Sequence, residues 1–358
     1  MKEGSVLENY EFRLTQFSPG AGCGCKIAPK ELEVILQCDD APMRFADLLV
    51  GNESHDDAAV YDIGNGQAVV STTDFFTPIV DNARDFGRIA ATNAISDVYA
   101  MGGVPLMAIA ILGWPLDKLP AELAREVVAG AREVCAAAKI PLAGGHSVNI
   151  ATPIFGLAVT GMVRTGQVKK NCTAQAGCRV FLTKPLGIGL VTTAEKCGIV
   201  KPGDAAEAIR LMTTLNVAGN DFAQLGGVHA MTDVTGFGLL GHALEMAGGS
   251  GIPMVLEYEK LPRIAGVDSY IAQDCMPGGT ARNWNSYGHK AIIDVANEDE
   301  EKVKALVCDP QTSGGLLVAV APNAVEELQK AAQKTNTPLF EVGYLTEPTK
   351  NETWVRVV

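Results

Sequence analysis

The chain has 358 residues, of which 47% are hydrophobic and 20% charged, and its formal net charge is −12. This composition predicts a globular protein with enough apolar material for two cores, and it excludes a disordered or fibrous chain. The negative charge argues against nucleic acid as a partner, because phosphate backbones are bound by clustered lysine and arginine.

No membrane span or signal peptide is expected. The longest apolar run, residues 104–116, is interrupted by proline and glycine, whereas a bilayer span needs about 20 continuous apolar residues. The first five residues are polar, unlike a signal peptide. The nine cysteines are an odd number and few for a disulfide scaffold of this length, which favours reduced thiols and a cytoplasmic protein.

Residues 1–50 are predicted to form a flexible arm and a short helix over residues 30–37. The arm carries Cys23-Gly24-Cys25-Lys26. A free thiol has a pKa of about 8.5, and a neighbouring lysine lowers it and enriches the nucleophilic thiolate. Half of a metal site and an inert tail are the alternatives, although no second Cys or His cluster has suitable spacing for zinc.

Residues 51–165 are predicted to form a first α+β domain that begins with a β-hairpin over residues 57–74. Asn65-Gly66 predicts a type I′ turn, and opposed residue numbers then sum to 131. Asp57 would face Asp74, and like charges across a ladder destabilise it. A bound cation or ligand donor would relieve this conflict, and a frayed, solvated strand end is the alternative.

Three further elements are expected in this half: helices over residues 86–101 and 121–138, and a strand over residues 154–163. In the first helix Asn93 and Asp97 lie on one face, because they are four residues apart. The segment Gly144-Gly145-His146-Ser147 would either bring backbone N–H groups to a nucleotide or make a tight turn.

A polar stretch over residues 164–177 is the predicted linker to a second domain, residues 172–358. There we expect a strand over 179–183, a helix over 187–196, a helix that opens after Thr232-Asp233, and a strand over 316–320. Strands and helices alternate without a regular βαβ period in either half. The expected fold class is therefore two-domain α+β.

The motifs of P-loop, dinucleotide-binding, zinc-protease and protein-kinase families are missing from the sequence. The candidate chemistry lies instead in acidic residues near predicted element ends, namely Asp56, Asp57, Asp74, Asp97 and Asp233. Magnesium prefers oxygen ligands and typically takes one or two carboxylates plus substrate phosphates. Each aspartate alone is also typical of a cap or turn.

Six segments together resemble the selenophosphate synthetases (selenide, water dikinases), in order and over nearly the whole chain. They are Gly20-Ala21-Gly22-Cys23-Gly24-Cys25-Lys26, Asp56-Asp57-Ala58-Ala59-Val60, Ser71-Thr72-Thr73-Asp74-Phe75-Phe76, Asn93-Ala94-Ile95-Ser96-Asp97, Met231-Thr232-Asp233-Val234-Thr235-Gly236-Phe237-Gly238 and Asp309-Pro310-Gln311-Thr312-Ser313-Gly314-Gly315. The resemblance implies an aminoimidazole-ribonucleotide-synthetase-like fold, with an α+β first domain, an α/β-type second domain and a homodimer through the N-terminal sheets.

The resemblance also implies residue roles. Cys23 matches the reactive Cys or selenocysteine, and Lys26 the essential lysine that approaches the phosphates. The implied magnesium ligands are Asp57, Asp97 and Asp233. The implied nucleotide contacts are Lys26, Ser54, His55, Asp56, Asp74, Asp97, Gly145, His146 and Ser147. One departure follows the last of these, where Val148-Asn149-Ile150-Ala151-Thr152 replaces an expected acidic segment.

The implied reaction converts selenide, ATP and water to selenophosphate, AMP and phosphate, with Mg²⁺ as cofactor and K⁺ as a candidate second cation. A selenium-delivery protein is a candidate partner, and neither nucleic acid nor a membrane is expected. Two alternatives stay open: another small-molecule kinase or synthetase of the superfamily, and a non-catalytic selenide or metal carrier that uses Cys23 and Cys25.

Overall fold

The computed structural model describes residues 12–18, 22, 26–27, 29–36, 45–296, 298–348 and 353–358. Before the first domain lie a short 3₁₀ helix, Leu14–Phe17, and α1 (Pro29–Leu36), which begins and ends one residue before the predicted helix. Within the described residues no helix combines the length and the apolar character needed to cross a membrane.

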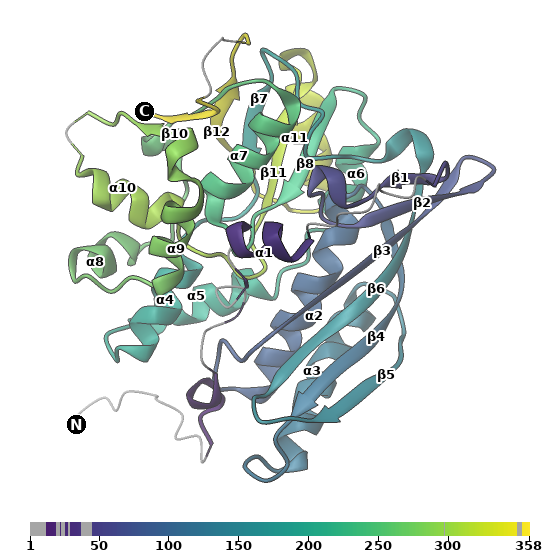
Figure 1. The fold of residues 1–358 in the computed structure, drawn as a ribbon, viewed down its shortest axis with the longest axis vertical. Helices are drawn as coiled ribbons and strands as arrows, with labels where there is room; N and C mark the ends of the chain where they lie inside the picture. Colours follow the sequence, from purple (N-terminus) through teal and green to yellow (C-terminus); the bar gives the residue numbers. More distant parts are fainter. Residues whose placement is uncertain are drawn as a thin grey trace.

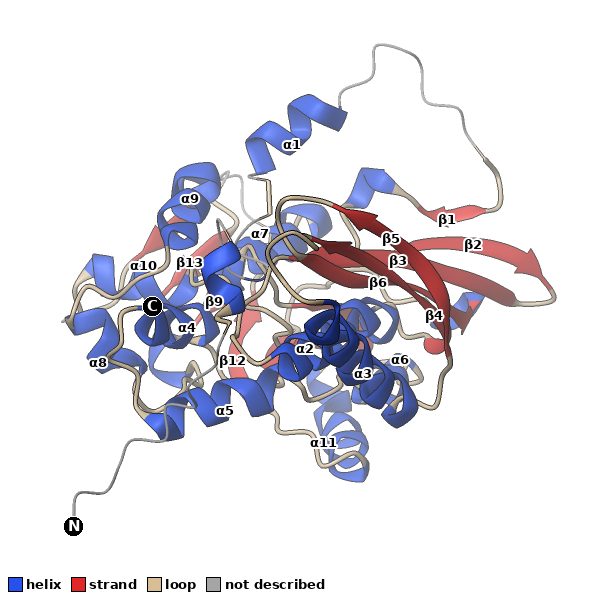
Figure 2. Cartoon of the chain, turned by 90° about the horizontal axis from the view of Figure 1, so that it is seen from below, coloured by secondary structure: helices blue, strands red, loops and turns tan. Residues whose placement is uncertain are grey.

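The first domain is built on a six-stranded sheet with α2 (Ala83–Ala100) and α3 (Ala121–Ala137) on one face (Figure 1). The strand order is β1-β2-β3-β6-β4-β5, and only the β4–β5 pair is parallel. Figure 2 shows the opposite face of this sheet without a covering helix from the described chain. The strands are β1 (Leu48–Val50), β2 (Ala59–Gly64), β3 (Gln67–Phe76), β4 (Val104–Trp114), β5 (Leu142–Asn149) and β6 (Ile154–Arg164).

The predicted hairpin is present, but its register is not the predicted one. Asn65 and Gly66 both have positive φ, as a type I′ turn requires. Beyond the turn, an irregularity between Asp62 and Gly64 shifts the pairing, so that opposed numbers sum to 130, as in Val60 opposite Val70. An extra residue in one strand has this effect. The predicted Asp57–Asp74 pairing is therefore wrong, and Asp57 lies before β2 begins.

Helix α2 begins at Ala83, three residues before the prediction, because the Asn82 side chain caps it by accepting a 2.9 Å hydrogen bond from the Asp85 N–H. The helix is buried along most of its length. It packs against β3 and β6 of its own sheet and also against β8, α5 and α6 of the second domain. This position between two domains explains why polar Asn93 and Asp97 are buried.

Gly144 to Ser147 do not form the tight turn that was one of the two predictions for this segment. Gly144 to Ser147 lie within β5, which pairs in parallel with β4 at the sheet edge. The backbones of the two strands approach closely here: a Cβ on Gly145 would lie 2.2 Å from the Ala110 carbonyl oxygen. Glycine is needed at this position for packing, which the sequence pattern does not distinguish from a phosphate-binding role.

The second domain has a seven-stranded sheet of order β10-β13-β9-β12-β7-β11-β8. Only the β10–β13 and β13–β9 pairs are parallel, so the sheet lacks the parallel pairing usual in an α/β domain. Its strands are β7 (Arg179–Leu182), β8 (Val228–Asp233), β9 (Met254–Leu256), β10 (Ala291–Ile293), β11 (Leu316–Val320), β12 (Phe340–Leu345) and β13 (Val355–Val357). Its helices are α4 (Ile188–Lys196), α5 (Pro202–Met212), α6 (Ala218–Ala223), α7 (Gly238–Ser250), α8 (Val267–Ala272), α9 (Gly278–Tyr287), α10 (Glu300–Val307) and α11 (Val325–Lys334).

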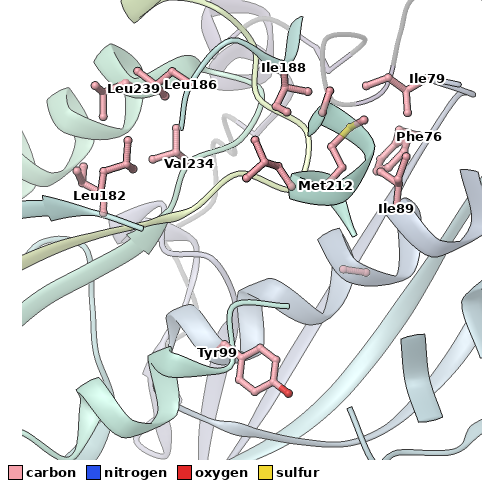
Figure 3. Packing of buried hydrophobic residues seen from close by; sticks show 14 of the residues in the cluster. Phe76, Ile79, Ile89, Tyr99, Leu182, Leu186, Ile188, Met212, Val234 and Leu239 are labelled. Carbon is pink, nitrogen blue, oxygen red and sulfur yellow. The ribbon is translucent and has the colours of Figure 1, made fainter. Parts of the chain in front are cut away.

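One cluster of buried apolar side chains extends through both domains. Figure 3 shows part of it, with Phe76 and Ile89 from the first domain and Ile188, Met212 and Leu239 from the second. Close-packed protein interiors deform little. The shared core therefore fixes the two sheets relative to one another, and it also fixes any site to which both sheets contribute.

Candidate active site

Three of the predicted acidic residues converge where the two domains meet. Asp57 lies just before β2, Asp97 in the last turn of α2, and Asp233 at the end of β8. The Thr232 hydroxyl donates to a carboxylate oxygen of Asp57 at 2.8 Å, across the domain boundary. The Thr72 hydroxyl donates to Asp97 at 2.5 Å. Contacts from both sheets thus orient these carboxylates.

Asp57, Asp97 and Asp233 form a carboxylate cluster in which three negative charges at once are unfavourable. Burial raises the pKa of Asp57 well above its ordinary value, and the nearby charges of Asp233 and Asp97 raise it further. The pKa of Asp97 is raised for the same reasons, by burial first and then by Asp233 and Asp74. Burial also raises the pKa of Asp233, against a hydrogen bond from Ser96. Such a cluster favours a bound cation, which would offset the repulsion.

Among the residues that the structure describes, two oxygens in the carboxylate cluster have no hydrogen-bond partner. These are Oδ2 of Asp57 and Oδ2 of Asp233, and both are buried. Leaving a buried polar atom unpaired is costly, so native structures usually provide a protein, water or ion partner. Unsatisfied carboxylate oxygens of this kind fit Mg²⁺, a hard cation that prefers oxygen ligands.

In the described chain, no set of three or more carboxylate, imidazole and thiol groups is arranged to hold a metal ion by itself. A magnesium site usually takes one or two carboxylates from the protein and completes its shell with water and substrate phosphates.

Lys26 and Asp74 lie beside this cluster. The Lys26 ammonium is 3.4 Å from Oδ2 of Asp74, and the same oxygen accepts a 2.7 Å hydrogen bond from the Asn93 side chain. The Asn93 carbonyl oxygen in turn accepts from the Ser313 N–H at 2.8 Å. This series of contacts, from Lys26 through Asp74 and Asn93 to Ser313, connects the N-terminal segment to both domains. Lys26 is close enough to the carboxylates that it opposes the rise in the pKa of Asp97 and Asp233.

His55 and Asp56 contact the interdomain linker, and their predicted role as nucleotide contacts stays a prediction. Oδ1 of Asp56 accepts a 2.7 Å hydrogen bond from the Asn171 N–H, and the His55 carbonyl accepts from the Asn171 side chain at 2.9 Å. His55 itself has φ of 51°, an uncommon value for a residue with a side chain. These contacts tie the turn before β2 to the interdomain linker, so both residues have a structural role here.

Gly145, His146 and Ser147 lie on the edge strand β5, away from Asp74, and their predicted role as nucleotide contacts stays a prediction. Asp74 pairs with Leu157, Leu157 with Ala110, and Ala110 with Gly145. Gly145 is thus three strands from Asp74, about 14 Å at roughly 4.8 Å per strand.

Asn149, in the segment that departs from the family, accepts a hydrogen bond from the Leu116 N–H at 3.3 Å.

Cys23 and Cys25 lie outside the described residues, as does the side chain of Ser54, so their predicted roles stay predictions. Several polar residues were not predicted as site residues although their contacts hold the site: Thr72, Ser96, Asn171, Lys184, Asn216, Thr232 and Ser313. Four of them lie in segments that carry the family resemblance, namely Thr72, Ser96, Thr232 and Ser313. Lys184, Asn171 and Asn216 had no sequence signal, because their partners are distant in the chain.

Comparisons with known proteins place the chain in a family. Residues 55–163 match the AIR synthase related protein, N-terminal domain, and residues 175–356 match the AIR synthase related protein, C-terminal domain. The selenide, water dikinase of Cronobacter sakazakii is 60% identical over 339 residues, which cover 95% of this chain and 96% of that protein. This chain belongs to the selenide, water dikinase family.

A second member of the family is similar over the same extent. The selenide, water dikinase of Escherichia coli K12 is 57% identical over 345 residues, 96% of each chain. Among solved structures, the thiamine-monophosphate kinase of Stenotrophomonas maltophilia K279a has a TM-score of 0.62 at 20% identity, over 87% of this chain and 91% of that one. At this identity the likeness shows the two-domain α+β fold and no more.

Proposed function

We propose that this chain makes selenophosphate, AMP and phosphate from selenide, ATP and water. The observation that carries the proposal is the 57–60% identity to curated selenide, water dikinases over nearly the full length. The carboxylate cluster supports it, since an ATP-dependent phosphotransferase has to hold a metal–triphosphate complex at a fixed position.

Asp57, Asp97 and Asp233 are proposed to hold Mg²⁺ together with the triphosphate. The ion, when bound, would polarise phosphate oxygens and offset charge as the γ-phosphoryl group departs. The protein contributes by fixing the carboxylates: Thr232 orients Asp57 and Thr72 orients Asp97. Because these hydrogen bonds come from different elements and, for Thr232, from the other domain, the site depends on correct domain packing.

Lys26 is proposed to bind the phosphates and to stabilise negative charge during transfer. Its contact with Asp74 places an ammonium group at the edge of the carboxylate cluster. A preorganised cation at this point needs no reorganisation when charge develops on the transferred group. Asp74, itself held by Asn93, acts as the positioning residue for Lys26.

Cys23 is proposed to bind, deliver or shield the selenium atom. It is three residues from Lys26 in the sequence, so the thiol and the ammonium must act within a short distance of one another. Thiolate sulfur is a soft, nucleophilic atom, suited to selenium chemistry as hydroxyl oxygen is not. Cys25 is proposed as auxiliary.

The uncovered face of the first sheet is proposed to form a homodimer interface. Large apolar side chains are exposed on it, among them Phe75, Met107, Ile109 and Val148. Exposed apolar side chains concentrated on one sheet face usually mark an interaction surface. Since the face belongs to one continuous sheet, a second copy of the same face would cover it symmetrically.

Phosphorus NMR of the protein with ATP, Mg²⁺ and selenide tests the reaction. We expect AMP, phosphate and a product with a phosphorus–selenium bond, all dependent on selenide. A superfamily kinase acting on another small molecule would leave ADP, and a selenide carrier would consume no ATP. Either of these outcomes would contradict the proposal.

A further inference from the structure

Helices α4 and α8 end in the same backbone motif, and a cysteine lies at each end. After α4, the Ile199 N–H bonds to the Ala194 carbonyl and the Gly198 N–H to the Glu195 carbonyl. Gly198 has positive φ. This pattern is a Schellman motif, in which Cys197 occupies the C-cap position.

The end of α8 repeats the pattern. The Cys275 N–H bonds to the Tyr270 carbonyl and the Asp274 N–H to the Ile271 carbonyl, with Asp274 in the left-handed conformation. Cys275 is thus the second residue beyond the C-cap. Both thiols are carried by backbone that hydrogen bonds fix in place.

The two helices pack against each other, and a cysteine follows each of them at its C-terminal end. The two thiols interact, since Cys197 is among the groups that raise the pKa of Cys275, and neither thiol is in a disulfide. Cys197 is exposed, whereas Cys275 is buried, with 4% of its surface accessible. Tyr270 strengthens the junction, since its hydroxyl accepts from the Lys201 N–H at 2.9 Å and donates to Asp204 at 2.6 Å.

We propose that Cys197 and Cys275 form a redox-active dithiol that closes reversibly into a disulfide when the protein meets a peroxide. This site is separate from the arm thiols and from the phosphotransfer site. The inference does not depend on the proposed function, because it rests on the packing of α4 against α8 alone.

The exposed thiol reacts first. The Cys197 thiolate attacks one peroxide oxygen, the O–O bond breaks, and a water molecule leaves after protonation, which yields a sulfenic acid. The Cys275 sulfur then attacks the Cys197 sulfur, a second water leaves, and the S–S bond forms. In sum, two thiols lose two electrons and two protons to one peroxide, which becomes two waters.

The unequal environments of the two thiols support this order. Burial, and then the interaction with Cys197, raise the pKa of Cys275 to about 11. A thiol with so high a pKa is rarely ionised, so it reacts slowly with a dissolved oxidant. It remains well placed to attack a sulfur atom that is already its neighbour.

The test is disulfide mapping on the full-length protein. The reduced protein is treated with hydrogen peroxide, alkylated, digested without reductant and analysed by mass spectrometry. We expect Cys197 and Cys275 to lose their alkylatable thiols together, to appear in one cross-linked peptide pair lighter by two hydrogens, and to recover on treatment with dithiothreitol. Amide hydrogen exchange at the ends of α4 and α8 should slow on oxidation, since the cross-link opposes local opening.

Single variants separate this dithiol from general thiol oxidation. In Cys275→Ala, Cys197 should lack its resolving partner and accumulate as sulfinic acid, and in Cys197→Ala, Cys275 should stay reduced. The control Cys172→Ala, a partly exposed thiol beside Gly249, should keep the wild-type cross-link. A cross-link from Cys197 to Cys23 or Cys25, or alkylatable Cys197 and Cys275 after the other exposed thiols have oxidised, would overturn the proposal.

Discussion

The Lys26 ammonium and the Asp74 carboxylate lie 3.4 Å apart, at the edge of the cluster formed by Asp57, Asp97 and Asp233. Asp74 is itself fixed by Asn93, whose carbonyl oxygen accepts from Ser313 of the second domain. The N-terminal lysine is therefore oriented by a series of contacts that depends on both domains. Disturbing any member should affect catalysis more than folding.

The Lys26→Met variant keeps most of the side-chain length and removes the charge. We expect kcat to fall by about 10²–10³-fold, the usual loss when one preorganised electrostatic contact is removed. Steady-state AMP formation measures it. Lys330→Met on α11, an exposed lysine, should retain wild-type kcat. Equal losses of kcat in the two variants would show that the effect on kcat does not come from the contact between Lys26 and Asp74.

The Cys23→Ser variant replaces sulfur with a harder and much less nucleophilic oxygen. Selenide-dependent AMP formation should collapse while ATP binding, followed by calorimetry, persists. Cys172→Ser serves as the matched control. Normal turnover of the Cys23 variant would remove the role proposed for this thiol.

The Asp57→Asn variant should lose nucleotide binding without losing stability. The amide can still accept the hydrogen bond from Thr232, but one buried negative charge is lost. Mg²⁺-dependent nucleotide binding should disappear in calorimetry. Without metal, Tm should be unchanged or higher by about 2–4 °C, the equivalent of roughly 1 kcal/mol. Exposed Asp47→Asn is the control, and a strongly lowered Tm for Asp57→Asn would contradict the account of charge repulsion.

Asp309 gives a pH dependence that can be tested apart from the metal site. Its carboxylate accepts hydrogen bonds from the Gly189 N–H at 3.0 Å and Gln311 at 2.7 Å, and burial raises its pKa from 3.8 to about 8. The folded state keeps a proton that the unfolded state has lost in this window. The stabilisation is complete below pH 3.8 and is lost as pH rises towards 8, by up to about 1.4 kcal/mol per pH unit.

Asp309→Asn should remove this slope, because the amide resembles the protonated acid at every pH. Urea denaturation from pH 5 to 9 measures it: the variant should gain stability relative to the wild type as pH rises and level off above about pH 8. Exposed Asp117→Asn is the control. Parallel curves for the Asp309 variant and the wild type would show that Asp309 is ionised throughout.

Ile109→Glu tests the dimer. Ile109 is 45% exposed on the uncovered face of the first sheet, and a symmetric interface there would bury an unpaired glutamate from each of the two copies. Sedimentation should give a dimer for the wild type and a monomer for the variant. Ile292→Glu, with 47% exposure on β10 of the other sheet, should leave the dimer intact. A monomeric wild type would refute this interface.

Local sequence was sufficient where a feature depends on neighbours in the chain. Asn65-Gly66 predicted its turn, the spacing of Asn93 and Asp97 placed both on one face of α2, and those helices and strands that were predicted lie within a few residues of their expected bounds. The acidic residues were also found from sequence, although their roles came from the family resemblance. These features follow from backbone preference and periodicity, which operate over a few residues.

Tertiary structure decided what depends on distant partners. The register irregularity in β2 separates Asp57 from Asp74, and β5 includes Gly145, which packs closely on Ala110. Thr232 reaches Asp57 only because one core joins the two domains. The buried environment that raises the pKa of Asp57, and the interaction between Cys197 and Cys275, have the same origin. Burial and proximity are properties of the packed molecule, and no local pattern encodes them.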